Sequence, residues 1–397
     1  MNRFTASQPI YCAYFRRQLQ PGNWALIEDN NIHTEDGKKP ALSQLLAQFG
    51  RVEPFSLLEF APMLDWEQVQ AGDRVLIWRS GGGGDILESL PIVYELQERG
   101  ARVVYCCEDY EFATALLGDV ERRHRRDFGM VPIEVDWVVS LEGCVEASTE
   151  PTHVLDLYLR RTINPPADLL DVANSLPGGK YQVMAREIAA DFIADREPAA
   201  TYEVILAPYA SARNRCIPLL ENLPEAFLKQ HTFAVVGSDP PPIVSDYPAL
   251  GKMPVAELYQ VLLNARLVVT TDNGLSHLAY WLGVPLIAFY SVVDWRARMH
   301  EAEGVCVVDL TDACLLAPCW WHHPGQCPVL ANGGEQVASC YATCYLQADK
   351  LAQLISHRLE ATDFQMVAGR ELAGVPDYAK ANKGLRYPDG SLVERKP

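Results

Sequence analysis

The sequence predicts an α/β protein of two domains, each built on a parallel sheet. Short apolar runs of strand length alternate with helical patterns in two successive series. A polar break near residues 196–202 separates the two series. The chain of 397 residues is also too long for one core of ordinary size. We therefore expect two Rossmann-like domains facing a central cleft, with ligands bound beyond the carboxyl ends of the strands.

The first series opens with a strand, a glycine loop and a helix. An apolar run at 74–78 is followed by four glycines at 81–84 and by a helical pattern that begins at Ile86. A second apolar run at 102–106 completes a βαβ unit, whose crossover is right-handed in nearly all proteins. The other elements expected here are strands at 137–140 and 153–156 and a helix at 181–194.

The second series repeats this alternation after the polar break. The expected strands are 203–207, 233–236, 267–271, 285–290 and 305–310, and the expected helices are 255–264, 275–282 and 348–359. Residues 1–70 are punctuated by Gly, Asn, Pro and Gln and are expected to be irregular, except for helical spacing at 42–49. The expected units are an extension at 1–70, domains at 71–197 and 198–360, a cysteine-rich loop at 312–346, and a polar tail at 361–397.

Composition and charge limit the classes of partner. Apolar residues make up 49% and charged residues 21% of the chain, which is typical of a globular protein. The net charge of −17 argues against non-specific nucleic-acid binding, although a local basic site for a small anion is compatible with it. No apolar run is long enough to span a bilayer, and the first residues lack the apolar region of a signal peptide. A cytoplasmic location is therefore expected.

The glycine loop and the residue after it are the first candidate for chemistry. Glycines at 81–84, including Gly83 and Gly84, allow a ligand to approach the backbone at the start of a helix. Asp85 follows them and has two interpretations. It is either a helix-capping residue in a tight turn, or a carboxylate at the cleft that serves as a general base.

The second candidate is a polar turn in the other series, at 270–277. Backbone amides from Asn273 to Ser276, including that of Gly274, suit a phosphate, because a helix begins there. The alternative is a capped helix with a buried His277. Upstream, Arg213 and Arg215 follow the expected strand at 203–207 and either clamp a diphosphate or lie solvated on the surface.

Five of the eleven cysteines fall within 31 residues and form a third candidate. They are Cys314, Cys319, Cys327, Cys340 and Cys344. Stable disulfides are rare inside cells, so a structural iron or zinc is one interpretation, with His322 and His323 as substitute ligands. Disulfides or buried free thiols are the alternatives.

Three motifs together resemble those of glycosyltransferase family 9, the ADP-heptose:lipopolysaccharide heptosyltransferases and their relatives. The segment GDILESLP at 84–91 resembles the family's G-D-x-L-x-x-L-P. RCIP at 215–218 stands where the family has K-x-W-P, with Lys and Trp replaced. The segment DNGLSHLA at 272–279, followed by LGVP at 282–285, resembles D-[ST]-G-x-x-H-L-A-x-x-L-G-x-P, with Asn273 in the Ser/Thr position.

The cysteine-rich loop is similar to that of the autotransporter heptosyltransferase branch, in which four cysteines hold iron. Cys314, Cys319, Cys327 and Cys340 match that quartet, with a longer first spacing. The resemblance covers about residues 72–358. Residues 1–70 and the tail match nothing in the family.

The resemblance implies a GT-B fold and inverting transfer of a sugar, with ADP-heptose as the leading donor, to a hydroxyl of a glycan or protein. It implies Asp85 as the base. Arg215 and the amides around Gly274 would stabilise the departing diphosphate without a catalytic metal. Asp272 and His277 would shape the donor site, with Ser276 beside them.

Two other functions stay open at this point. A sugar-nucleotide epimerase has a similar architecture and would turn over its substrate without an acceptor. A non-catalytic binding or assembly subunit would fit the replaced K-x-W-P motif and the unmatched N-terminal extension. The oligomeric state, including a homo-oligomer, is equally open.

Overall fold

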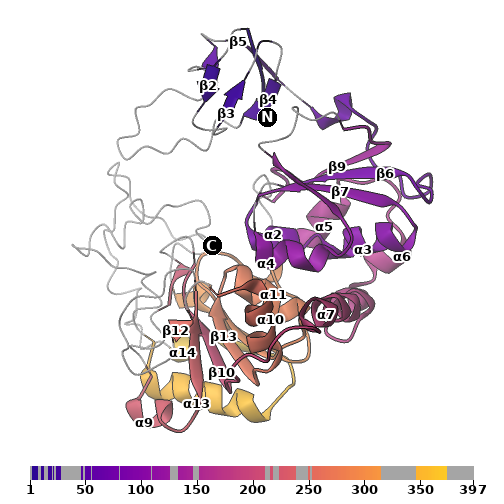
Figure 1. The fold of residues 1–397 in the computed structure, drawn as a ribbon. Helices are drawn as coiled ribbons and strands as arrows, with labels where there is room; N and C mark the ends of the chain where they lie inside the picture. The colour runs from indigo at the N-terminus through magenta and orange to yellow at the C-terminus, as the bar shows by residue number, and fades with distance from the viewer. Residues whose placement is uncertain are drawn as a thin grey trace.

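The computed structural model shows two parallel α/β domains and two small antiparallel N-terminal sheets (Figure 1). The structure describes residues 2–7, 10–12, 17–19, 21, 24–27, 46–47, 50–54, 56–79, 81–108, 110–125, 133–145, 152–210, 215–217, 223–237, 249–250, 253–313 and 346–372. Two Rossmann-like domains, the GT-B arrangement that the resemblance implies, are thereby confirmed.

The N-terminal domain contains a four-stranded parallel sheet in the order β8-β7-β6-β9. Its strands are β6 (Arg74–Trp78), β7 (Arg102–Cys107), β8 (Glu121–His124) and β9 (Trp137–Ser140). Strands β7 and β8 are added on one side of β6, and β9 is added on the other side. The strand order therefore reverses between β6 and β9, and the carboxyl ends of these two strands form the switch point where such sheets bind ligands. The apolar runs predicted all strands except β8, which is an edge strand of charged residues and carries no apolar signal.

Short helices flank this sheet, and they correct two expectations, one helix and one strand. They are α2 (Gly83–Leu87), α3 (Leu90–Glu98), α4 (Glu111–Thr114), α5 (Val154–Leu159) and α6 (Ala167–Leu170), with 3-10 turns η2 (Leu57–Glu59), η3 (Ala115–Leu117) and η5 (Val172–Ser175). The single helix expected from Ile86 is split into α2 and α3, because Pro91 lacks the amide that would continue the ladder. The expected strand at 153–156 is wrong: His153 caps helix α5 there by accepting a hydrogen bond from the Leu155 amide.

The C-terminal domain contains seven parallel strands in the order β12-β11-β10-β13-β14-β15-β16. They are β10 (Val204–Ala207), β11 (Phe233–Val236), β12 (Ala249–Leu250), β13 (Leu267–Thr271), β14 (Leu286–Tyr290), β15 (Val305–Asp309) and β16 (Gln365–Ala368). Its switch point lies between β10 and β13. The five strands expected here are confirmed, whereas β16 corrects the expected polar tail, because residues 365–368 pair with β15.

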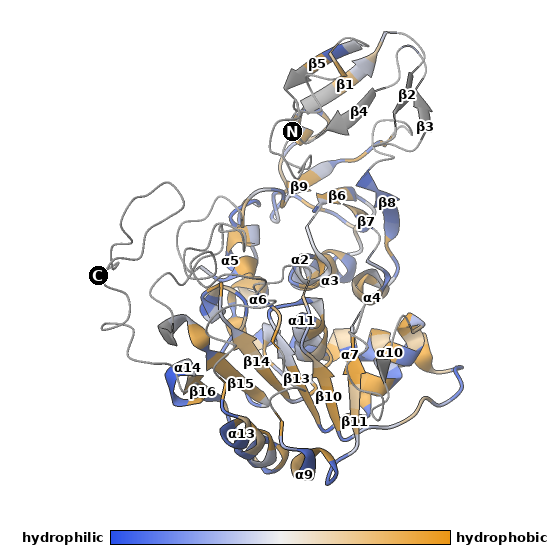
Figure 2. Ribbon diagram, turned by 90° about the vertical axis from the view of Figure 1, so that its left-hand side faces the viewer, coloured by the Kyte–Doolittle hydropathy of each residue, from blue (hydrophilic) through white to orange (hydrophobic). Residues whose placement is uncertain are grey.

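Helices cover the apolar faces of this sheet, whose strands are the most hydrophobic part of the ribbon (Figure 2). They are α9 (Glu225–Leu228), α10 (Val255–Leu263), α11 (Gly274–Trp281), α13 (Ala348–Glu360) and α14 (Gly369–Leu372), with 3-10 turns η7 (Trp295–Ala297) and η8 (Leu310–Ala313). Helix α13 is amphipathic and buries Leu351 and Ile355 against the sheet. None of the described helices is long and apolar enough to cross a membrane.

The expected irregular extension instead contains antiparallel sheet. Strand β1 (Asn2–Ala6) pairs with both β4 (Trp24–Ile27) and β5 (Gly50–Pro54), while β2 (Ile10–Cys12) pairs with β3 (Arg17–Leu19). These strands are short and pair across loops, so no local periodicity reveals them. Residues 62–66 pair with β9 and with Ile163, so chain before residue 71 already belongs to the N-terminal domain.

The largest hydrophobic cluster of the described residues joins the two domains. Helix α7 (Lys180–Ile193) lies beside α10 in the C-terminal domain (Figure 1), and the rings of Phe192 and Tyr259 contact at 5.6 Å. The Tyr259 hydroxyl donates to the Phe112 carbonyl at 2.5 Å, and Tyr280 donates to the Ser175 carbonyl at 2.9 Å. The largest core cluster accordingly contains residues of both domains.

Candidate active site

Asp85 lies in the first turn of α2, directly after the glycine loop that follows β6. One carboxylate oxygen accepts a hydrogen bond from the Gly82 amide at 2.8 Å. The other is 3.0 Å from Arg79 Nη2 and 3.8 Å from Arg298 Nη1. The side chain is 18% exposed. Asp85 therefore stabilises the turn and also presents a carboxylate at the domain junction, whereas its role as a general base stays a prediction.

The two arginines determine the charge of Asp85. Burial alone would raise the pKa of Asp85, but the guanidinium groups of Arg79 and Arg298 outweigh it and lower the pKa below its usual value. The carboxylate is therefore ionised at neutral pH. An ionised carboxylate in this place can accept a proton, as a general base must.

Arg79 was not singled out in the sequence, although it directly follows the predicted strand at 74–78. Its side chain is 1% exposed, and its Nε donates to the Tyr158 hydroxyl at 3.0 Å. That hydroxyl donates to the Asp85 carbonyl at 3.1 Å. Arg79 and Tyr158 thus hold both the side chain and the backbone of Asp85.

The predicted glycines Gly83, Gly84 and Gly274 allow the two domains to approach each other. A Cβ built on Gly83 or Gly274 would lie 2.2 Å or 2.6 Å from the Phe112 ring. A Cβ on Gly84 would lie 2.6 Å from His277 Cδ2. The helix starts of α2 and α11 therefore meet around Phe112, which brings the two sequence motifs together at the carboxyl ends of both sheets.

Arg215 and Asp272 meet at the switch point of the C-terminal sheet. Arg215 follows β10 and Asp272 follows β13, and Arg215 Nη1 is 3.2 Å from Asp272 Oδ2. Asp272 is buried, and the Thr271 hydroxyl donates to the Arg215 carbonyl. The structure therefore places Arg215 where the sequence predicts a diphosphate clamp. Arg213 lies outside the described residues.

Asn273 corrects the predicted role of the amides at 273–276. Its Oδ1 accepts from the amides of Leu275 at 2.9 Å and Ser276 at 3.0 Å. Its Nδ2 donates to the carbonyls of Ala207 and Tyr209 at 3.0 Å and 2.8 Å, which ties α11 to the loop after β10. Two of the amides expected to bind phosphate are thus already capped by this side chain.

Ser276 and His277 are both buried in the first turns of α11. The Ser276 hydroxyl donates to the Asn273 carbonyl at 2.6 Å, so this side chain also supports the cap. His277 Nδ1 is 2.6 Å from Oε1 of Glu88, a residue of the N-terminal domain that the sequence reasoning missed. Glu88 occupies a variable position of the G-D-x-L-x-x-L-P motif, so only the tertiary structure reveals it.

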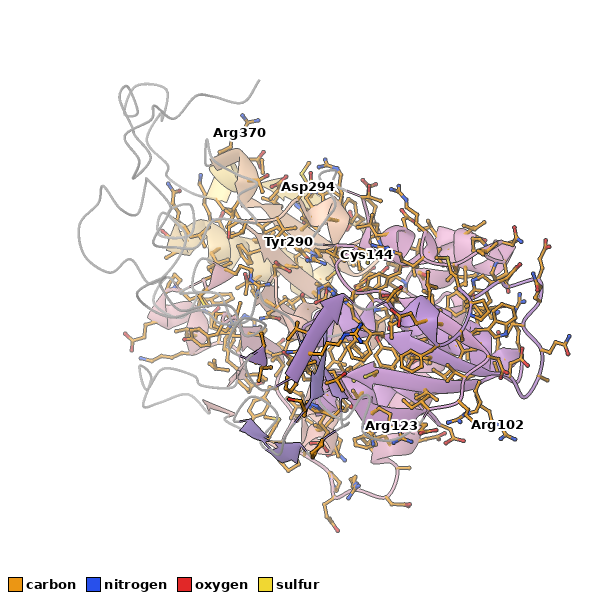
Figure 3. The ribbon with its side chains drawn as sticks, turned by 90° about the horizontal axis from the view of Figure 1, so that it is seen from above. Arg102, Arg123, Cys144, Tyr290, Asp294 and Arg370 are labelled. Carbon is orange, nitrogen blue, oxygen red and sulfur yellow. The ribbon has the colours of Figure 1, made fainter. Side chains whose placement is uncertain are left out.

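Tyr290 lies inside the same junction. Burial raises its pKa well above the usual range, and among the charges that act on it are those of Asp272, Arg298 and Glu88. In Figure 3, Tyr290 and Cys144 lie on the inner side of the molecule, whereas Arg102 and Arg123 lie at the outer edge of the N-terminal domain. Tyr290 of the C-terminal domain is therefore one of the buried side chains that lie near the charged residues Asp272, Arg298 and Glu88.

The cysteine-rich loop cannot be placed in this site. Cys314, Cys319, Cys327, Cys340 and Cys344 lie outside the described residues. Within the described ranges, no group of three or more His, Cys, Asp or Glu side chains is arranged to hold a metal ion. The structural metal stays a prediction from the sequence.

Comparison with known families finds one match. The model described as glycosyltransferase family 9 (heptosyltransferase) matches residues 244–309, which contain Asp272, Asn273 and His277. The resemblance that the motifs indicate is thereby confirmed for this part of the C-terminal domain. Comparison with curated protein sequences finds no match.

Several solved structures are similar to this chain at low identity. Escherichia coli heptosyltransferase WaaC with ADP is 16% identical over 72% of this chain and 99% of its own, with a TM-score of 0.44. A family 9 glycosyl transferase from Veillonella parvula is 12% identical over 73% and 97%, with a TM-score of 0.47. The iron-containing dodecameric glycosyltransferase TibC from enterotoxigenic E. coli is 13% identical over 58% and 64%, with a TM-score of 0.38. The assignment below rests on the motifs, the matched segment and the geometry.

Proposed function

We propose that this chain is an inverting glycosyltransferase that moves a heptose from a nucleoside-diphosphate donor to a hydroxyl of a glycan or protein. The observation that carries the proposal is the Asp85 carboxylate at the junction of two domains, in contact with Arg79 of its own domain and Arg298 of the other. The family 9 segment, which contains Asp272 and His277, lies directly across that junction. ADP-heptose is the leading donor, because the matched family is described as heptosyltransferase.

The C-terminal switch point is suited to hold the donor. Arg215 is a quarter exposed and bonded to the buried Asp272, so its guanidinium is oriented while part of it stays accessible. A guanidinium binds phosphate oxygens through charge-assisted hydrogen bonds. Arg215 would stabilise the negative charge that develops on the departing diphosphate, and Asp272 would hold Arg215 in place.

Asp85 would act on the acceptor. Its carboxylate takes the proton of the acceptor hydroxyl as that oxygen forms a bond to the anomeric carbon. The bond between the anomeric carbon and the diphosphate oxygen breaks on the opposite face, and the electron pair leaves with the diphosphate. One displacement of this kind inverts the anomeric configuration and needs no covalent enzyme intermediate.

Purified full-length protein with a panel of nucleotide sugars tests the proposal. We expect ADP-heptose and ADP to raise the melting temperature more than UDP-glucose or GDP-mannose, because a ligand at 100 times its Kd stabilises by about 2.7 kcal/mol. We also expect ADP release together with heptose recovered on a glycan or protein acceptor. Binding of no nucleoside diphosphate would contradict the proposal, and so would conversion of the donor to an isomeric nucleotide sugar.

A further inference from the structure

A buried acid–imidazole pair crosses the domain junction beside Asp85. Glu88 lies in the turn between α2 and α3 and is 3% exposed, and His277 belongs to α11 of the other domain. Glu88 Oε1 and His277 Nδ1 are 2.6 Å apart. Burial alone would raise the pKa of Glu88, but the hydrogen bond and charge of His277 outweigh it and lower the pKa. An ionised carboxylate only accepts hydrogen bonds, so His277 Nδ1 carries the proton.

The opposite edge of the His277 ring packs against Gly84, the residue before the candidate base. A Cβ built on Gly84 would lie 2.6 Å from His277 Cδ2 and 3.1 Å from Nε2. This edge therefore contacts the backbone immediately before Asp85.

The other groups around Glu88 do not neutralise its charge. Glu88 Oε2 is 3.9 Å from His153 Nε2. His153 Nδ1 accepts from the Leu155 amide, and burial lowers the pKa of His153 to about 3, so this ring stays neutral. His300 stacks on His153 at 3.8 Å between ring centroids, and burial also lowers its pKa. His277 is accordingly the group that Glu88 bonds.

We propose that Glu88 is a positioning residue of the transfer reaction. Its carboxylate accepts a hydrogen bond from His277 Nδ1 across the domain junction, so that the ring of His277 keeps its place against Gly84, beside Asp85. This assignment rests on the proposed function. It differs from a purely structural bridge between domains, because it requires an effect on turnover.

The kinetic test compares Glu88→Gln with Glu95→Gln. The control residue Glu95 is another buried glutamate, bonded to Lys180, Arg99 and Tyr181 and not to His277. We expect Glu88→Gln to lower kcat about 10- to 100-fold, with the donor KM changed less than about threefold, because small errors of position slow a reaction by that order. Glu88→Asp, which keeps the carboxylate, should recover part of kcat. An unchanged kcat in Glu88→Gln, or an equal loss in Glu95→Gln, would overturn the proposal.

A spectroscopic test is independent of activity. In protein labelled with [15N]histidine, the His277 signals, assigned by their loss in His277→Gln, should show a proton on Nδ1 in the wild type and in Glu95→Gln. Glu88→Gln should change these signals. A wild-type His277 without a proton on Nδ1 overturns the positioning role even if heptosyl transfer is observed. Conversely, absent transfer with a proton on Nδ1 refutes the proposed function and leaves the Glu88–His277 geometry intact.

Discussion

Arg298 reaches Asp85 from the opposite domain, with Nη1 3.8 Å from Oδ1. Arg79, on the same domain as Asp85, is nearer at 3.0 Å. Both guanidinium groups favour the ionised carboxylate, because opposite charges at this range lower the pKa of an acid. The ionisation of the candidate base therefore depends partly on contact between the two domains.

Replacing Arg298 should change the pH dependence of transfer. Burial raises and the two arginines lower the pKa of Asp85, so Arg298→Gln removes a lowering influence and raises this pKa. Because turnover requires ionised Asp85, the acid-side decline of kcat should begin at higher pH. The control is Arg296→Gln, an exposed arginine of the same 3-10 turn, which should keep the wild-type profile. The prediction is refuted if the acid-side decline of kcat in Arg298→Gln begins at the same pH as in the wild type, or at a lower pH.

Replacing Arg215 should weaken donor binding specifically. A charge-assisted contact with phosphate contributes about 1.5–3 kcal/mol, so Arg215→Ala should raise the Kd for ADP roughly 10- to 100-fold. Arg266→Ala is the control, because Arg266 is an exposed partner of Glu203 at the other end of the sheet. Calorimetric titration with ADP measures both. Equal ADP affinity in wild type and Arg215→Ala would show that another group holds the diphosphate.

Replacing Gly274 should disturb the contact between the domains. Its Cβ would lie 2.6 Å from Phe112 Cζ, and overpacking of this kind costs about 1–3 kcal/mol. Gly274→Ala should therefore lower the free energy of unfolding, and Phe112→Leu should restore part of it in the double variant. Gly82→Ala is the steric control, since its Cβ would meet nothing nearer than 3.7 Å. Additive effects of the two substitutions would contradict this account of the glycine.

The cysteine-rich loop yields a prediction from sequence alone. Four thiolates order a loop of few apolar residues when they bind a metal, because binding free energy becomes folding free energy. We expect about one iron or zinc per chain in protein purified without a metal-affinity tag. Substitution of Cys319 or Cys327 by Ser should release the metal and unfold this region locally. Elemental analysis without stoichiometric metal, or titration that finds all five thiols free, rejects the site.

The sequence predicted the positions of those candidate residues that a local pattern of strand, loop and helix marks. Asp85 and Asp272 each lie where an apolar strand is followed by the start of a helix, so the order of elements alone places them at sheet switch points. The partners of these residues were missed for a physical reason. Arg298 and Glu88 act across a domain junction, and no spacing within the chain encodes a contact between residues about two hundred positions apart.

The strands divide in the same way into those that a local pattern predicts and those that depend on distant segments. Strands buried on both faces were predicted from their apolar runs, such as β6 and β13. The edge strand β8, the N-terminal antiparallel strands and β16 depend on pairing with distant segments and were missed. The strand expected at 153–156 failed because a segment of four residues in which only Val154 and Leu155 are apolar fits a helix turn as well as a strand, and the His153 cap decides between them.

The most direct test of the central claim is the transfer rate of Asp85→Asn at saturating donor. The substitution keeps the size of the side chain but removes the proton acceptor. We expect kcat to fall by about two to four orders of magnitude while the Kd for ADP stays within a fewfold of wild type, because a general base contributes rate and not donor affinity. Asp171→Asn, at an exposed helix cap where Asn serves equally well, should leave kcat unchanged. Turnover of Asp85→Asn close to that of the wild type would contradict the account.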